Sequence, residues 1–127
     1  MFSQKQHQEE AQQVGSQFVR YYYNLFDTDR QQLQNLYTPE SLLYWHGEVC
    51  RGSTQISSGI TNLPFNKIVH VITTDDHQLT PQNYILSMVI GQLQMDSNRP
   101  VNFHETFLLK KESQSWMLIN QAFRFTS

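Results

Sequence analysis

The segment VGSQFVRYYYNLF, Val14–Phe26, decides how the rest of the chain must fold. Its apolar residues recur at steps of three and four, which places them on one face of a long helix. They are Val14, Phe18, Tyr21, Tyr22, Leu25 and Phe26. A helix with a single apolar face is stable only when that face covers another apolar surface. The segment therefore predicts a long N-terminal helix that packs on a flat, apolar layer.

The next forty residues predict two more short helices with a hairpin between them. Asp27–Arg30 offers N-caps for a second helix through Leu33, Leu36 and Tyr37, which Thr38-Pro39 ends. Leu42–Trp45 reads as a strand, Gly47 permits a turn, and residues 49–51 return. Ser53 or Thr54 caps a third helix with Ile56, Ile60 and Leu63 on one face, and Pro64 ends it.

Four strands are predicted in the remainder of the chain, because β-branched and aromatic residues dominate it and turn signals interrupt it. The strands span Asn66–Thr80, Tyr84–Met95, Asn102–Lys111 and Ser115–Phe125. Helices followed by hairpin-linked strands predict an α+β fold in which an antiparallel sheet wraps around the opening helix. We expect one domain over residues 1–127, with about residues 1–9 frayed.

Composition excludes several classes of protein. A net charge of −2 and the absence of any Lys/Arg cluster argue against nucleic-acid binding. No apolar run approaches the ~20 residues that span a bilayer, and the start of the chain is too polar for a signal peptide. The single cysteine, Cys50, fits a reducing compartment. These features predict a cytosolic protein with no nucleic-acid or membrane partner.

No motif for catalysis or metal binding is present. His70 and His77 lie an odd number of residues apart on one predicted strand, so we expect them on opposite faces. The other histidines lack ligand spacing, and neither a nucleophile elbow nor a Gly-rich phosphate loop is found. General acid–base chemistry in a sheet-lined cavity stays open as an alternative. Its candidate groups are Asp75, Asp76, Asp96, Glu105 and Tyr44.

Trp45, followed by His46 and Gly47, places a large apolar side chain beside a titratable one at a strand end. Other apolar residues lie at predicted strand or helix ends, and Asp96 follows one of them; they are Leu63, Ile68, Leu93, Met95 and Phe123. Apolar walls with an acidic rim suit a partner's aromatic residue flanked by Lys or Arg. The alternative is that these residues plug the open end of the core.

From Val14 to Phe125 the chain resembles the nuclear transport factor 2 family. The residues that carry the resemblance include Gly15–Val19, Tyr22–Asp27, Asp29-Arg30, Gln32-Leu33, Leu36-Tyr37, Trp45, Gly52, Leu63–Phe65, Lys67-Ile68, Asp76–Gln78, Gly91–Leu93, Phe107–Lys110 and Phe123-Arg124. The resemblance implies a cone-shaped α+β fold with a strongly bent sheet and a homodimer formed through the sheet faces. It also implies a non-enzymatic carrier of Ran-GDP without a cofactor, shared between cytoplasm and nucleus and concentrated at the nuclear pore.

In this family a cavity at the open end of the cone takes a Phe of Ran, and acidic rim residues pair with basic side chains. The matching cavity positions are Trp45, Leu63, Ile68, Leu93, Ala122 and Phe123, and Asp96 matches a rim position. Two rim positions depart from the family: His46 replaces a Glu and Asn98 an Asp, with Glu48 as a candidate substitute. The family's aromatic residue for phenylalanine-repeat nucleoporins is Ala11 here.

Two other functions remain as alternatives. A paralogous cofactor that heterodimerises with an mRNA-export receptor also lacks the Glu after the Trp, and residues 123–125 are similar to it. Leu63–Phe65 and Asp76–Gln78 look more like the transport factor. A small-molecule lyase or isomerase on the same cone is the other alternative, because a fold does not fix a function.

Overall fold

Helices and strands follow one another in the order that the sequence predicts. The computed structural model describes residues 4–126 of the chain. Its elements are α1 (Gln4–Thr28), the 3₁₀ helix η1 (Arg30–Leu36), β1 (Tyr37–Trp45), β2 (Glu48–Arg51), α2 (Ser53–Thr61), β3 (Ile68–Leu79), β4 (Ile85–Met95), β5 (Val101–Glu112) and β6 (Ser115–Phe125). Helix α1 begins at Gln4, within the stretch expected to fray, and residues 1–3 lie outside the described part.

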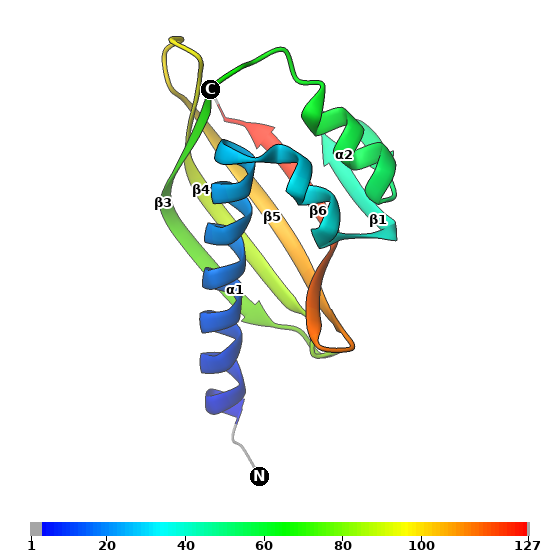
Figure 1. Ribbon diagram of the computed structural model, residues 1–127. Coiled ribbons are helices and arrows are strands. Elements are labelled where there is room, and N and C mark those ends of the chain that lie inside the picture. Colours follow the sequence, from blue (N-terminus) through cyan, green and yellow to red (C-terminus); the bar gives the residue numbers. More distant parts are fainter. Residues whose placement is uncertain (1–3, 127) are drawn as a thin grey trace.

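Helix α1 runs along one face of a curved sheet, and its N-terminal turns extend past the lower end of the strands (Figure 1). Its buried residues are Ala11, Gly15, Phe18, Val19, Tyr22, Tyr23 and Phe26, which confirms the predicted helix and its apolar face. One position is corrected: Tyr21 is 53% exposed, and Tyr23 is buried instead. Among the described residues no helix is both long and apolar enough to cross a membrane.

The sheet has six strands in the order β2-β1-β6-β5-β4-β3 and does not close into a barrel. Strands β3 to β6 form the predicted antiparallel meander. The expectation of a wholly antiparallel sheet is wrong, because β1 pairs in parallel with β6. After β2 the chain passes through α2 to the opposite edge of the sheet, where β3 lies. Strands β3, β4, β5 and β6 then run up and down across the sheet, so that β6 pairs with β1. The α+β cone fold with a bent sheet around the helix is confirmed.

The segment after α1 differs from the prediction. The expected second helix through Tyr37 is the 3₁₀ helix η1, which ends at Leu36, and β1 begins at Tyr37. Thr38-Pro39 lies inside β1 instead of ending a helix. Proline is tolerated here because the register of β1 with β6 shifts between Tyr37 and Leu42, and Pro39 is exposed.

A β-bulge in β3 reverses the prediction that His70 and His77 face opposite ways. The register with β4 shifts between Ile72 and Thr74, which inserts one residue and restores both histidines to the same face. His70 Nδ1 lies 2.7 Å from Asp27 Oδ1 on α1. His77 lies between Asp75 Oδ2 and Ser87 Oγ, at 2.7 and 2.6 Å. Both histidines therefore lie under α1.

The Asp75 carboxylate joins this arrangement to the helix. Arg20 Nη1 on α1 donates to Asp75 Oδ2 at 2.8 Å. The hydrogen bond from Arg20, with a smaller contribution from His77, lowers the pKa of Asp75 to about 2. The same helix reaches further along β3, where the Gln8 side chain bonds the His77 carbonyl and the Leu79 amide. These contacts cover part of an edge strand.

Candidate partner-binding site

Trp45 and Phe123 form an aromatic stack at the open end of the cone. Parallel pairing of β1 with β6 sets the two residues side by side, and their rings lie 4.4 Å apart and nearly parallel, at 9°. Phe123 in turn stacks on Phe103 at 5.3 Å and 20°. Phe103 and Phe123 are buried, whereas Trp45 is only half-buried. An aromatic column therefore runs from the core to the surface and ends at Trp45.

Beside Trp45 a small pocket opens between the β1–β2 hairpin and α2. Its volume is about 160 Å³. The lining residues are Leu43, Trp45, Glu48, Cys50, Ile56, Gly59, Ile60 and Leu63. Typical sites for drug-sized ligands are about two or more times larger, but an apolar cavity of about 150 Å³ holds benzene. This pocket, called the Gly59 pocket below, matches one apolar side chain.

The His46 ring lies against the end of β6, outside this pocket. Its backbone has φ 49° and Gly47 follows with φ 89°, which forms the turn between β1 and β2. The ring stacks on Phe125 at 4.8 Å and 29° and meets Phe123 edge-on at 5.8 Å. Its Nε2 is buried without a hydrogen-bond partner among the described residues. His46 thus covers aromatic surface at the expense of one unpaired polar atom.

Asp96 and Asn98 lie in the β4–β5 turn at the same end of the molecule. Asp96 Oδ1 accepts hydrogen bonds from the backbone N–H groups of Asn66 and Lys67, at 3.0 and 2.9 Å. The Asn98 backbone N–H donates to the Met95 carbonyl at 3.1 Å. Both side chains are exposed. In Figure 1 this turn lies at the upper left and α2 at the upper right, so the β4–β5 turn and α2 are on different sides of the molecule.

The remaining predicted site residues fall into three places. Leu63 lines the Gly59 pocket with Trp45. Ile68 and Leu93 are 2% and 3% exposed and belong to the core. Ala122 lies neither in the pocket nor in the core. Successive residues of a strand face opposite sides of the sheet, so Phe123 points inward and Ala122 lines a hollow on the outer face. The assignment of Ala122 to the pocket is corrected on this ground.

One acid–base candidate, Glu105, is buried in the core with 2% exposure. Tyr23 Oη donates to its Oε1 at 2.7 Å, and Gln121 Nε2 donates to its Oε2 at 2.6 Å. Burial raises the pKa of Glu105 to about 8, against the opposing effect of these two hydrogen bonds. Buried aromatic rings, including Tyr22 and Phe107, fill the surrounding space. The carboxyl group is therefore enclosed in the core, with one oxygen held by Tyr23 and the other by Gln121.

The other acid–base candidates lie elsewhere. Tyr44 is 43% exposed, Asp76 is exposed, and both face the outer side of the sheet. Asp75 is paired with Arg20. Among residues 4–126 no group of three or more His, Cys, Asp or Glu side chains is arranged to hold a metal ion.

Sequence patterns do not identify several of the pocket residues. These are Leu43, Cys50, Ile56, Gly59 and Ile60, for which the patterns predict only a place in a strand or helix. A signal was present in Gly59, because a glycine inside a helix costs stability and needs a reason. The burial of Glu105 also has a sequence signal. Glu105 lies midway between Phe103 and Phe107, and the two-residue period of a strand places all three side chains on the inner face.

A curved sheet around one long helix, open at an aromatic-lined end, defines the class of this domain. A family model, the Nuclear transport factor 2 (NTF2) domain, matches residues 14–125. The chain belongs to the nuclear transport factor 2 family.

Named relatives agree with this assignment. Nuclear transport factor 2 of Candida glabrata and that of Saccharomyces cerevisiae are each 38% identical over 113 residues, covering 87% of this chain and 90% of the relative. The solved structure of nuclear transport factor 2 from Cryptosporidium parvum is 33% identical, with a TM-score of 0.86 over 90% of this chain and 93% of that one. The family and these names support a role in nuclear transport.

Proposed function

We propose that this chain is a non-enzymatic nuclear transport carrier that binds Ran-GDP at the open end of the cone. The observation that supports it best is Trp45, which is half-exposed, fixed by its stack on Phe123 and placed beside a pocket of side-chain size. A rigid aromatic wall next to an apolar recess is typical of the residues that dominate protein interfaces. The relatives named as nuclear transport factor 2 support the same role.

Two acidic side chains, Asp96 and Glu48, are available to a basic partner surface. Asp96 is held by two backbone hydrogen bonds, which leave its outer oxygen toward solvent, and Glu48 is exposed beside the pocket. Complementary charges raise association rates and fix orientation. His46 and Asn98 supply no such charge, so we expect binding with fewer ionic contacts than in relatives that carry acids at both positions.

The outer face of the sheet is proposed as the homodimer interface. It carries exposed apolar side chains, namely Tyr44, Val49, Val69, Val71, Met88 and Ile90, of 37% to 62% exposure. Two hollows of about 360 and 390 Å³ lie on the same face. Clusters of exposed apolar side chains are typical of protein interaction sites. A second copy of the chain supplies a surface of the same character, as a two-fold interface requires.

Phenylalanine-repeat nucleoporins are the other proposed partner, with the protein shared between cytoplasm and nucleus and concentrated at the pore. Ala11, at the family's aromatic position, is 3% exposed and offers little contact surface. We therefore expect weaker nucleoporin binding than in a relative with an aromatic residue there.

Immobilised Ran loaded with GDP or GTP tests the Ran proposal in a pull-down at low salt. The carrier is retained by Ran-GDP and not by Ran-GTP. Equal retention on both, or on neither, contradicts it.

A cofactor of an mRNA-export receptor is the alternative that one observation favours. His46 stands where the transport family has Glu, and its ring packs on Phe125 near the chain end, where residues 123–125 resemble that cofactor. The solved Candida albicans Mtr2–Mex67 M domain complex shares the fold, with a TM-score of 0.77 at 16% identity. Sedimentation of the chain with and without an export-receptor domain separates the two: a homodimer unchanged by the receptor excludes this alternative.

A further inference from the structure

Strand β3 forms one edge of the sheet, and its first half has a composition typical of strands that pair with other chains. It is the last member of the strand order and has 12 residues, whereas β2 at the other edge has 4. The segment Ile68–Thr74 reads IVHVITT, in which every residue except His70 is β-branched, and it contains no Pro, Gly, Lys, Arg, Asp or Glu. Short segments of high β propensity and low charge readily add strands when they lie on an edge. Strand β3 therefore carries a risk of self-pairing that β2 avoids by its shortness.

Helix α1 follows β3 in the opposite direction over most of the length of the strand. Asp27 meets His70 near the start of the strand, and Gln8 meets Leu79 at its end. From Gln8 to Asp27 the helix covers roughly 28 Å, and from His70 to Leu79 the strand covers roughly 30 Å. Because these two lengths match, side chains near both ends of α1 reach the backbone of the same edge strand.

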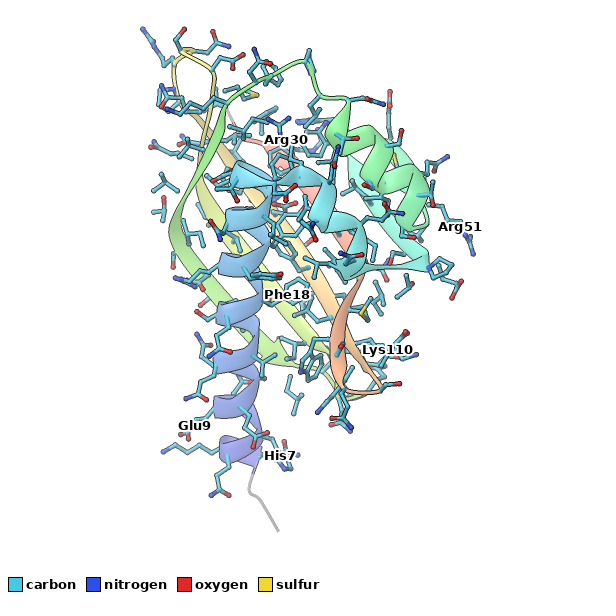
Figure 2. All side chains as sticks on the ribbon, in the orientation of Figure 1. His7, Glu9, Phe18, Arg30, Arg51 and Lys110 are labelled. Carbon is cyan, nitrogen blue, oxygen red and sulfur yellow. The ribbon has the colours of Figure 1, made fainter. Side chains whose placement is uncertain are left out.

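The Gln8 side chain takes the place of a neighbouring strand at the end of this edge. Its Nε2 donates to the His77 carbonyl at 2.6 Å, and its Oε1 accepts from the Leu79 backbone N–H at 3.0 Å. One side-chain amide thus satisfies a backbone acceptor and a backbone donor of β3, as the peptide groups of an added strand would. Gln8 belongs to the lowest part of α1, between His7 and Glu9, which are labelled in Figure 2.

Asp27 caps the edge near the start of β3. Its Oδ2 accepts the His70 backbone N–H at 2.9 Å, and its Oδ1 lies 2.7 Å from Nδ1 of the same histidine. Between the two capped positions, the bulge after Ile72 breaks the regular spacing of the backbone groups. A strand that is capped near both ends and irregular in the middle is a poor template for another strand.

We propose that Gln8 and Asp27 act as an edge guard, which prevents β3 from pairing with β3 of a second copy of this chain. Two copies of one edge can pair antiparallel about a two-fold axis, because each supplies the N–H and C=O groups that the other lacks. Gln8 lies in the first turns of α1, where a helix frays most readily, so fraying of the helix lifts this cap first. The guard lies on the β3 edge and does not depend on the partner proposed above.

Amide hydrogen exchange measures each cap separately. Gln8→Ala removes one cap, and Gln12→Ala is the matched control because Gln12 is exposed on the same helix. We expect Gln8→Ala to speed exchange of the Leu79 amide about tenfold or more and Gln12→Ala to change it less than about twofold. Asp27→Ala speeds exchange of the His70 amide in the same way, whereas Asp27→Asn keeps a side-chain acceptor and preserves the protection.

Sedimentation, together with a fibril-binding dye, measures the association that the guard prevents. We expect the double variant Gln8→Ala/Asp27→Ala to form assemblies of at least about twice the mass of the parent species at the same concentration. Adding Thr73→Lys, which places a charge at the exposed bulge of β3, suppresses these assemblies. Thermal unfolding confirms that each variant is folded, and Gln8→Ala alone is used if the loss of Asp27 prevents folding.

Three results would overturn the edge guard. A Leu79 amide that exchanges at the parent rate in folded Gln8→Ala shows that the cap protects nothing. Variants with faster exchange but the mass of the parent show that the caps do not prevent association. Assemblies that persist with Thr73→Lys show that association uses another surface. The proposed function stands in each case, since neither measurement requires a partner.

Discussion

Trp45 and Phe123 lie face to face, with ring centroids 4.4 Å apart, because β1 and β6 run parallel and in register at the open end. Truncation of Trp45 removes one wall of the pocket and exposes the buried Phe123 ring. We expect Trp45→Ala to weaken Ran-GDP binding by about 2 kcal/mol or more, roughly thirtyfold. Calorimetry measures this, with Tyr21→Ala on the exposed side of α1 as the control. Equal loss in both variants would show that the effect is not specific to the pocket.

Replacement of His46 by Glu restores a carboxylate at the open end. It also removes the ring that stacks on Phe125, which costs the fold about 0.5–1.5 kcal/mol. We therefore expect stronger Ran-GDP binding together with a lower unfolding midpoint. His46→Gln, which loses the ring without adding charge, is the control. Binding that weakens in both variants would mean that the ring and not the charge decides affinity.

Glu105 makes the stability of the fold depend on pH. The pKa of its carboxyl is about 8 in the folded chain against 4.5 in the reference state. Between these values the folded state binds more protons than the unfolded state, so the free energy of unfolding falls as pH rises and levels off above about pH 8. The loss is on the order of 5 kcal/mol, since each unit of difference between the two pKa values corresponds to about 1.4 kcal/mol. Urea denaturation across this pH range measures it.

Glu105→Gln is the variant that isolates this effect. The glutamine side chain cannot ionise. If the Gln121 amide rotates by half a turn, its oxygen accepts the hydrogen bond from the amide nitrogen of the new glutamine side chain. The Gln121 amide nitrogen then donates to the Tyr37 hydroxyl. We expect the variant to lose most of the decline in stability between about pH 5 and about pH 8. An equal decline in parent and variant would assign the pH dependence to other groups.

Two glycines that both lie on helices should respond in opposite ways to alanine. A Cβ at Gly15 would strike the His77 ring, which is fixed by Asp75 and Ser87. We expect Gly15→Ala to destabilise the fold by about 1–3 kcal/mol, whereas Gly59→Ala is neutral or stabilising. Chemical denaturation of the two variants tests this pair. A stable Gly15→Ala variant would show that α1 can move away from β3 at little cost.

Ile90 tests the outer face of the sheet. It is 53% exposed, so Ile90→Lys should change the stability of a single chain by no more than about 0.5 kcal/mol. In a two-fold interface the same change buries two lysines close together, and we expect the dimer to dissociate in sedimentation equilibrium. Tyr21→Lys, equally exposed on α1, should leave association unchanged. A dimer that survives Ile90→Lys would place the interface elsewhere.

Much of the fold could be predicted because periodicity reports which side of an element is buried. The α1 face and the β3–β6 meander followed from it. The errors arose where tertiary structure altered that periodicity. The bulge after Ile72 returned His70 and His77 to one face, and β1 began earlier than expected because Pro39 fits at an irregular, exposed position. Neither the bulge nor the irregular position of Pro39 can be predicted from the hydrophobic pattern of the sequence.

The candidate site was predicted only in part, for a similar reason. Trp45 and Leu63 meet at one pocket, but Ile68 and Leu93 are buried and Ala122 faces the other side of the sheet. The pocket itself depends on how α2 lies against the β1–β2 hairpin, which local sequence does not specify. Parallel pairing of β1 with β6, between segments about eighty residues apart, brings Trp45 to Phe123 and is likewise invisible to local patterns.

Calorimetric titration of the parent chain with Ran-GDP and with Ran-GTP measures whether the chain is a carrier of Ran-GDP. We expect saturable binding of Ran-GDP, with an affinity that falls as salt rises, and no measurable binding of Ran-GTP. Absence of heat with Ran-GDP, under conditions where a nuclear transport factor 2 relative binds it, would contradict the assignment of this chain as a Ran-GDP carrier.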